Sequence, residues 1–195
     1  MSRAFKTLAI FFAFVAIYTL SRYGHTSTTT TTSSTTTIAL TTTTGAKVGA
    51  TTCHGSDFRG SFNQGQGAAG TVYASITLTK TTPGACTIKG WPILTLQDRL
   101  GALLTSSTVD LPTASAPIHF TDARANQAPS PVSLTTGATT TFSLAYSDVP
   151  TGAATCPSAQ TVSVSFTQGG STVAVTPQYP PAPCNHGLVW VSPFY

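Results

Sequence analysis

The sequence contains no glutamate and few charged residues of any kind. Lys, Arg and Asp make up 7% of the 195 residues, against roughly a quarter in an average soluble domain. Glu and Lys stabilise exposed helices, and no window of the sequence places apolar residues at helical spacing. These absences exclude a mainly helical fold.

Positive charge is scarce where a nucleic-acid surface would need it. The formal net charge is +4, but Arg3, Lys6 and Arg22 supply three of these units before residue 45. From residue 45 onward the sequence has six basic residues and five Asp, a net charge of +1. The six basic residues are scattered singly. Neutralising phosphates requires clustered Lys and Arg. We therefore expect no nucleic-acid partner.

The first 25 residues predict export. Arg3 and Lys6 precede an uncharged apolar run of fourteen residues, 7–20, which is shorter than the about twenty that a membrane span needs. No Ala-x-Ala cleavage site follows. We expect 1–25 to form a short apolar helix that is a signal peptide or, slightly favoured, an uncleaved signal-anchor in the cell membrane. In both cases the rest of the chain is exported.

Residues 26–50 predict a disordered tether. Sixteen of the nineteen residues in 26–44 are Thr or Ser, which leaves too few apolar groups for a core. This Thr/Ser-rich segment would hold the following domain, 51–195, away from the membrane.

From residue 51 onward the pattern has period two. In 71–79, Val72, Ala74, Ile76 and Leu78 share one face, and 141–147 and 161–167 repeat the alternation. A tight turn at 168–171 leads to 172–176, and weaker strands are predicted at 58–62, 93–97, 132–134 and 188–191. Residues 105–131 predict a long loop with one short strand around His119 and Phe120. Eight or nine short strands favour an all-β, two-sheet, immunoglobulin-like sandwich.

Four cysteines in an exported chain favour disulfides. Cys53, Cys86, Cys156 and Cys184 allow three pairings, of which sequence neighbours, Cys53 with Cys86 and Cys156 with Cys184, are the simplest. The adjacent His54 and His186 would permit a Cys2His2 metal site, but only with both thiols reduced and brought together. We expect no metal site and no cofactor.

The sequence also offers little for catalysis. A hydrolase would want a Gly-x-Ser-x-Gly elbow or a comparable framework, and no such pentapeptide occurs. His119 and Asp122 are three residues apart, which in a strand points them to opposite faces. Segment 65–70 has the glycine spacing of a dinucleotide-binding turn, but a strand rather than a helix follows, so we interpret it as a Gly-rich turn. We expect no catalytic residue.

Several of these elements together resemble a known family. They are Cys53, the Gly-Ala-Ala-Gly turn into an aromatic strand at 67–73, the Cys-Thr-Ile-Lys-Gly-Trp-Pro segment at 86–92, the Leu-Thr-Thr-Gly element at 134–137, Cys156, Cys184 and the closing 189–193. This order resembles the exported, mainly actinobacterial family of the domain of unknown function 4232. The resemblance implies an exported β-sandwich with two disulfides and implies no reaction.

The function predicted from the sequence is a non-enzymatic, membrane-tethered module of the cell envelope, of unknown biochemical activity. The alternative is a module that binds envelope glycan or another ligand through exposed Trp91, Tyr73, Tyr179 or Trp190; a hydrolase is the least favoured alternative. The expected partners are the cell membrane, through the N-terminal segment, and cell-wall glycan or another envelope protein.

Overall fold

The computed structural model describes residues 51–113, 117–152 and 155–195. This part of the chain is all-β, with two single-turn 3₁₀ elements and no α-helix. In chain order the elements are β1 (Thr51–Thr52), η1 (Gly55–Asp57), β2 (Phe58–Ala68), β3 (Thr71–Lys80), β4 (Cys86–Ile88), β5 (Ile93–Gln97), β6 (Ser107–Asp110), η2 (Ala123–Asn126), β7 (Val132–Leu134), β8 (Thr139–Ser147), β9 (Thr161–Ser165), β10 (Thr172–Val175) and β11 (Leu188–Val191).

These strands form three sheets, where the sequence predicts two. The largest has the order β2-β3-β8-β11-β6, the second is β10-β9-β5, and the third, β1-β4-β7, consists of strands of two or three residues. All pairs are antiparallel except β6 with β11 and β1 with β4. The sequence does not predict the third sheet, because β1 and β4 are too short to produce an alternating pattern.

The main core lies between the two larger sheets. Ile76 and Phe142 from the five-stranded sheet belong to the same buried cluster as Val164 and Val175 from the other. Strand β3 alternates as predicted, with Val72, Ala74, Ile76 and Leu78 buried and the residues between them half-buried. The last residues of the chain complete this core, since the ring of Phe194 makes edge contacts with Phe142 and Phe166.

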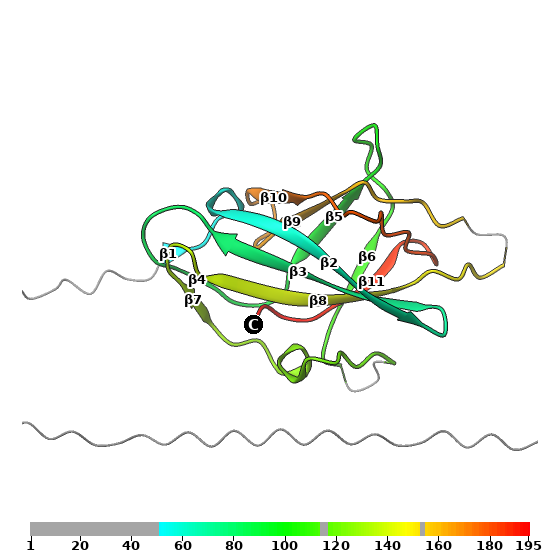
Figure 1. The fold of residues 1–195 in the computed structure, drawn as a ribbon, viewed down its shortest axis with the longest axis horizontal. Coiled ribbons are helices and arrows are strands. Elements are labelled where there is room, and N and C mark those ends of the chain that lie inside the picture. The colour runs from blue at the N-terminus through cyan, green and yellow to red at the C-terminus, as the bar shows by residue number, and fades with distance from the viewer. Residues whose placement is uncertain (1–50, 114–116, 153–154) are drawn as a thin grey trace, which may run out of the picture. The chain divides into compact units, whose positions relative to one another are not determined.

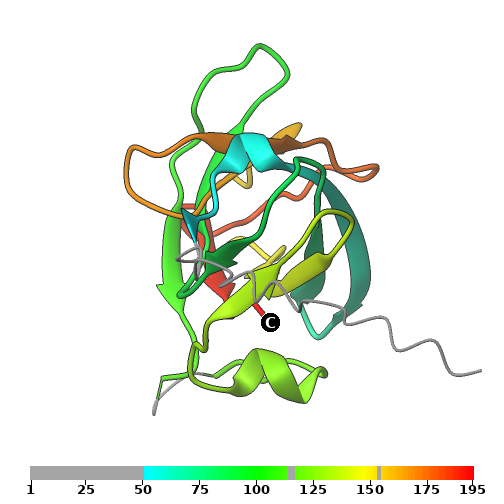
Figure 2. The ribbon, with the colours of Figure 1, turned by 90° about the vertical axis from the view of Figure 1, so that its left-hand side faces the viewer.

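Part of the outer face of the five-stranded sheet is covered by residues 117–126, which contain η2 and are called the η2 segment below, together with Leu111. Leu111, Ile118, Phe120 and Ala125 form a second buried cluster with Ala145 of β8. Figures 1 and 2 show η2 on one side of β8, with β9 and β10 on the opposite side. Strand β8 is therefore buried on both faces.

The strand predicted around His119 and Phe120 is absent, and the strand of this region is β6, at 107–110. Asn126 explains the difference. Its side chain accepts a hydrogen bond from the Phe120 amide (2.9 Å) and donates one to the Phe120 carbonyl (2.7 Å). One side chain thus makes both bonds that a neighbouring strand would have made, so Phe120 is held in a loop.

The Gly-rich turn predicted at 65–70 is also shorter than expected. Residues 65–68 belong to β2, whose register shifts between Gln64 and Gly67, and only Ala69 and Gly70 form the turn, with φ of 50° and 80°. Two successive residues with positive φ match the twist of a tight hairpin, so Gly70 has a conformational role. The glycines of β2 lie in extended backbone at a sheet edge.

The predicted signal segment 1–25 and tether 26–50 lie outside the described residues. Within the ranges that are described, no helix is long and apolar enough to cross a membrane.

Candidate functional site

The four cysteines form two disulfides between sequence neighbours, the pairing that the sequence analysis favours. Cys53 is joined to Cys86 and Cys156 to Cys184, with Cα–Cα distances of 5.0 and 4.3 Å. The thiols considered as metal ligands are thus used in disulfides. In the described ranges, no three His, Cys, Asp or Glu side chains lie close enough together to hold a metal ion.

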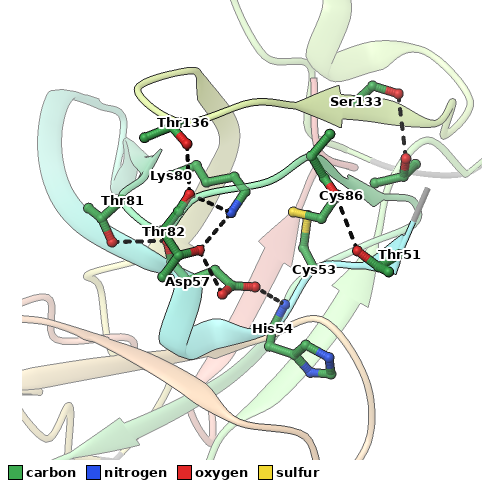
Figure 3. The surroundings of a disulfide bond; sticks show 12 residues. Thr51, Cys53, His54, Asp57, Lys80, Thr81, Thr82, Cys86, Ser133 and Thr136 are labelled. Atoms are coloured by element: carbon green, nitrogen blue, oxygen red, sulfur yellow. Dashed lines mark hydrogen bonds between the residues drawn. A yellow bond between two sulfur atoms is a disulfide. The ribbon is translucent and has the colours of Figure 1, made fainter. Parts of the chain in front are cut away.

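Beside the first disulfide lies a buried lysine, Lys80, with only 2% of its surface exposed (Figure 3). Its ammonium donates to the carbonyl oxygen of Thr82 (3.0 Å) and to the hydroxyl of Thr82 (2.7 Å). That hydroxyl in turn donates to Asp57 Oδ1 (2.9 Å). A hydroxyl therefore links the buried cation to a carboxylate, and the charge of Lys80 is compensated without a direct ion pair.

The Asp57 carboxylate is fixed by three neighbours. The backbone N–H of His54 donates to its Oδ2 (2.9 Å), which lowers the pKa of Asp57 below its ordinary value. The Thr82 hydroxyl and the charge of Lys80 act in the same direction, while partial desolvation opposes them. This network connects η1 to the end of β3. Both carboxylate oxygens of Asp57 and the Thr82 hydroxyl are engaged within it, which is typical of a structural element rather than a reactive one.

His119 and Asp122, the acid–base pair weighed from the sequence, make no hydrogen bond to each other among the described residues. His119 is exposed, and the Asp122 carboxylate is bound by Arg124 through the guanidinium (2.7 and 3.1 Å) and the backbone N–H (2.9 Å). These bonds lower the pKa of Asp122. The Arg124 guanidinium also lies over the ring of Tyr195, 4.8 Å from its centroid. Asp122 is therefore a strongly ionised carboxylate with a bound counter-charge, which is unsuited to proton transfer near neutral pH.

The four aromatic residues proposed as a glycan platform lie in different environments. Tyr179 is 61% exposed and stands apart from the others. Trp91 packs against the main core, and its indole N–H donates to the carbonyl oxygen of Leu111 (2.7 Å). Tyr73 and Trp190 pack under the η2 segment in the second cluster. The structure brings together only Tyr73 and Trp190, in one row with Ala145 between them.

Next to this row, the outer face of the five-stranded sheet is polar. The register places Asn63 of β2, Ser75 of β3 and Ser143 of β8 side by side. The following row, Ser61, Thr77 and Thr141, is also composed of hydroxyls. Tyr73, Ala145 and Trp190, by contrast, pack in the second cluster, under the η2 segment.

A groove of about 240 Å³ lies where the polar rows meet that segment. We call it the outer-sheet groove and define it by the side chains used below, namely Asn63, Tyr73, Ser75, Phe120, Asp122 and Ser143. Tyr73 and Phe120 meet edge to face, with ring centroids 6.4 Å apart. The hydroxyls of Ser143 and Tyr195 are 2.8 Å apart and share a hydrogen bond.

Sequence reasoning identified Tyr73 as a candidate but missed Asn63, Ser75 and Ser143. The alternation in 71–79 places Tyr73 and Ser75 on the same outward face. The sequence cannot supply the strand register that sets Asn63 and Ser143 on either side of Ser75. It also cannot show that the η2 segment forms one wall of a groove.

The comparisons with known proteins identify a family for the described domain and give no activity. No curated protein and no solved structure matches the chain. A family model described as "Domain of unknown function (DUF4232)" matches residues 53–195, which span both disulfides and all strands from β2 to β11. Because this match covers most of its length, the chain belongs to the DUF4232 family.

Proposed function

We propose that this protein is a non-enzymatic module of the cell envelope, exported and tethered to the membrane by residues 1–25 through the Thr/Ser-rich segment 26–50. The observation that carries the proposal is the state of the cysteines, since all four are paired in disulfides. Such bonds persist in oxidising compartments outside the cytoplasm. The family match supports the domain type and gives no reaction.

Two hydrogen-bonded carboxylates support a non-enzymatic role, while Asp110 differs from them because burial raises its pKa. General acid–base catalysis asks for a group held near the substrate with a pKa near the working pH. Asp57 and Asp122 both have a lowered pKa and are engaged by neighbouring residues. We further propose that the two larger sheets are a variant of the immunoglobulin-like sandwich, a fold that commonly serves recognition and spacing.

The test is protease treatment of intact cells that express the full-length chain. We expect the domain to be degraded while a small N-terminal fragment stays with the membrane. Alkylation of the exported protein without reductant should find no free thiol. A protease-protected, cytoplasmic protein with reactive thiols would overturn the proposal.

His119→Ala tests the non-enzymatic part. Because His119 is exposed, we expect both the stability and any envelope phenotype of a deletion strain to be unchanged by this substitution. A folded variant that failed to complement the deletion would contradict a purely structural role and would place a functional site at His119. The second candidate function, ligand binding, is favoured by the outer-sheet groove.

A further inference from the structure

We propose that the outer-sheet groove binds one ring of an uncharged glycan. This inference rests on the proposed extracytoplasmic function, since envelope glycans occur there. It names a ligand class and a site, which the family match does not.

The groove presents hydrogen-bonding groups that the described part of the protein leaves without a partner. Asn63 uses one amide N–H for Thr77 Oγ1 (3.1 Å), while its side-chain oxygen makes no hydrogen bond within the described residues. The hydroxyls of Tyr73 and Ser75 likewise make none there. An amide oxygen accepts, and hydroxyls both donate and accept. Sugar hydroxyls, which also do both, match this set.

An aromatic wall borders these polar groups on one side. Phe120 is buried and Tyr73 half-buried, and their edge-to-face contact closes the groove towards the η2 segment. A pocket with apolar walls and a few convergent polar groups is the usual form of a small-ligand site. A sugar ring has the same two-sided character, with C–H groups on its faces and hydroxyls at its edges.

The charge of the groove favours a neutral ligand. Asp122 is the only charged side chain among the described residues that line it, and Arg124 already neutralises that carboxylate at 2.7 Å. An anionic sugar would be repelled by the Asp122 carboxylate and would find no unpaired cation among the described residues that line the groove. A cationic ligand would have to displace Arg124 from two hydrogen bonds.

The size and rigidity of the groove fit one ring. Its volume, about 240 Å³, lies below the roughly 300 Å³ at which sites for drug-sized ligands begin. Ser75 and Ser143 lie on paired, central strands, and the Ser143 hydroxyl is held by Tyr195. Groups held in place before binding lose little entropy when the ligand arrives.

The experiment measures binding of neutral trisaccharides of glucose, mannose, galactose and N-acetylglucosamine to the full-length exported chain with intact disulfides. Saturation-transfer NMR would detect binding and calorimetry would measure Kd, with trigalacturonate as the anionic comparison. We expect at least one neutral trisaccharide to bind and trigalacturonate not to bind. Co-sedimentation with purified cell wall, reversed by that trisaccharide, would identify the wall as the source. Binding without co-sedimentation would identify a soluble sugar.

Variants locate the site. Asn63→Ala and Ser75→Ala each remove one hydrogen-bonding group and should weaken binding by about fivefold. Tyr73→Phe keeps the ring packed and should have a similar effect. The matched control is Tyr179→Phe, which removes the same hydroxyl from an exposed tyrosine outside the groove and should leave Kd unchanged. Thermal unfolding would verify that each variant is folded.

The site proposal is overturned if the folded protein binds none of the four neutral trisaccharides, or binds one with a Kd that the three groove variants do not change. Strand-like pairing of a peptide with the edge strand β2, seen by amide shifts confined to β2, would assign the surface to a protein partner instead. Failure of this proposal is separable from failure of the proposed function. Protease shaving reports export whether or not any sugar binds.

Discussion

Lys80 is the residue whose burial most needs an explanation, because a charged side chain is rarely fully buried without a partner. Here the stem of Lys80 lies at the end of a buried strand face, while the ammonium reaches Thr82. Thr82 in turn receives support from Thr136, whose hydroxyl donates to the Thr82 carbonyl (2.9 Å). The site therefore combines apolar packing along the stem with a polar end, and the two contributions can be separated by substitution.

We predict that Lys80→Ala lowers the free energy of unfolding by about 2 to 4 kcal/mol, because it removes a buried stem and leaves a cavity. Lys80→Met keeps the stem and removes the charge, and we expect a smaller loss, about 1 to 2 kcal/mol, because the Thr82 hydroxyl still bonds to Asp57. Urea unfolding of both variants would measure this, with the exposed Lys89→Ala as the control. If Met were as damaging as Ala, the hydrogen bonds rather than the stem would dominate.

The lowered pKa of Asp57 predicts a dependence of stability on pH. A carboxyl whose pKa is lower in the folded protein binds fewer protons there than in the unfolded chain. Its contribution is present above the unfolded pKa, near 3.9, and is lost as the pH falls through the folded value. Asp57→Asn should therefore flatten the fall in stability below about pH 4.

Unfolding midpoints measured from pH 7 to pH 2 would test this prediction. Asp148→Asn is the control, because this exposed side chain makes no hydrogen bond within the described residues. Asp122, whose pKa Arg124 also lowers, should retain part of the acid sensitivity in the Asp57→Asn variant. An unchanged pH profile in Asp57→Asn would contradict the assignment.

At the scale of elements, β8 determines how the two buried clusters meet. Phe142 and Leu144 face the main core, and Ala145, which is fully buried, faces the η2 segment. A small residue is needed at 145 because Tyr73 and Trp190 lie directly beside it on the neighbouring strands. The η2 segment can approach the sheet only over that small side chain.

We predict that Ala145→Leu destabilises the protein by about 1 to 3 kcal/mol, since added methylenes in a packed site force neighbours to shift. Hydrogen exchange should increase first at the amides of Phe120 and Ala125, in the covering segment. Ala174→Leu places the same change at an exposed position of β10 and serves as the control. Equal destabilisation by both variants would show that the effect is not specific to this contact.

The elements that sequence could predict are those whose pattern follows from burial alone. Strand β3 was predicted because one face is in the core and the other is half-buried, so its residues alternate. Strand β8 keeps the alternation only in part, since Ser143 and Ala145 are buried as well. β1 and β4 were missed because they are too short for any pattern, and they depend on the adjacent disulfide and on pairing with each other.

The covering segment and the groove could not be predicted for a different reason. Asn126 holds the backbone of Phe120 through two hydrogen bonds across six residues. Nothing in the sequence indicates that Phe120 bonds to this side chain rather than to a neighbouring strand. The Pro-rich composition of segment 178–183 gives no sign of packing, yet Pro181 and Pro183 are buried against the main core. In both cases tertiary contacts decide the conformation of residues that have no periodic pattern.

At the scale of the whole domain, the two disulfides restrain different parts of the described chain. Cys53–Cys86 joins the loop before η1 to β4, within the small third sheet, and both sulfurs are buried in the main core. Cys156–Cys184 joins the loop before β9 to the segment before β11, and Cys184 also donates its amide to the Ser147 carbonyl (2.9 Å). Ion pairs contribute little beside these disulfides, because the described residues form only one, between Arg124 and Asp122.

We predict that removing either disulfide by double Cys→Ala substitution lowers the free energy of unfolding by about 3 to 4 kcal/mol, from the chain entropy released by loops of 33 and 28 residues. The loss at Cys53 and Cys86 should be the larger, because both side chains also pack in the core, whereas Cys156 is half-buried. Urea unfolding of the two double variants would measure the difference.

Removal of both disulfides should then cost about 7 kcal/mol, which is comparable to the entire stability of a typical domain, about 5 to 15 kcal/mol. We therefore expect reduction of the wild-type protein to abolish or nearly abolish the folded state at 37 °C, measured by near-ultraviolet circular dichroism with and without reductant. A reduced protein that stayed fully folded would show that hydrophobic burial alone suffices. In that case the cysteines would have to be explained by something other than stability, such as resistance to proteolysis outside the cell.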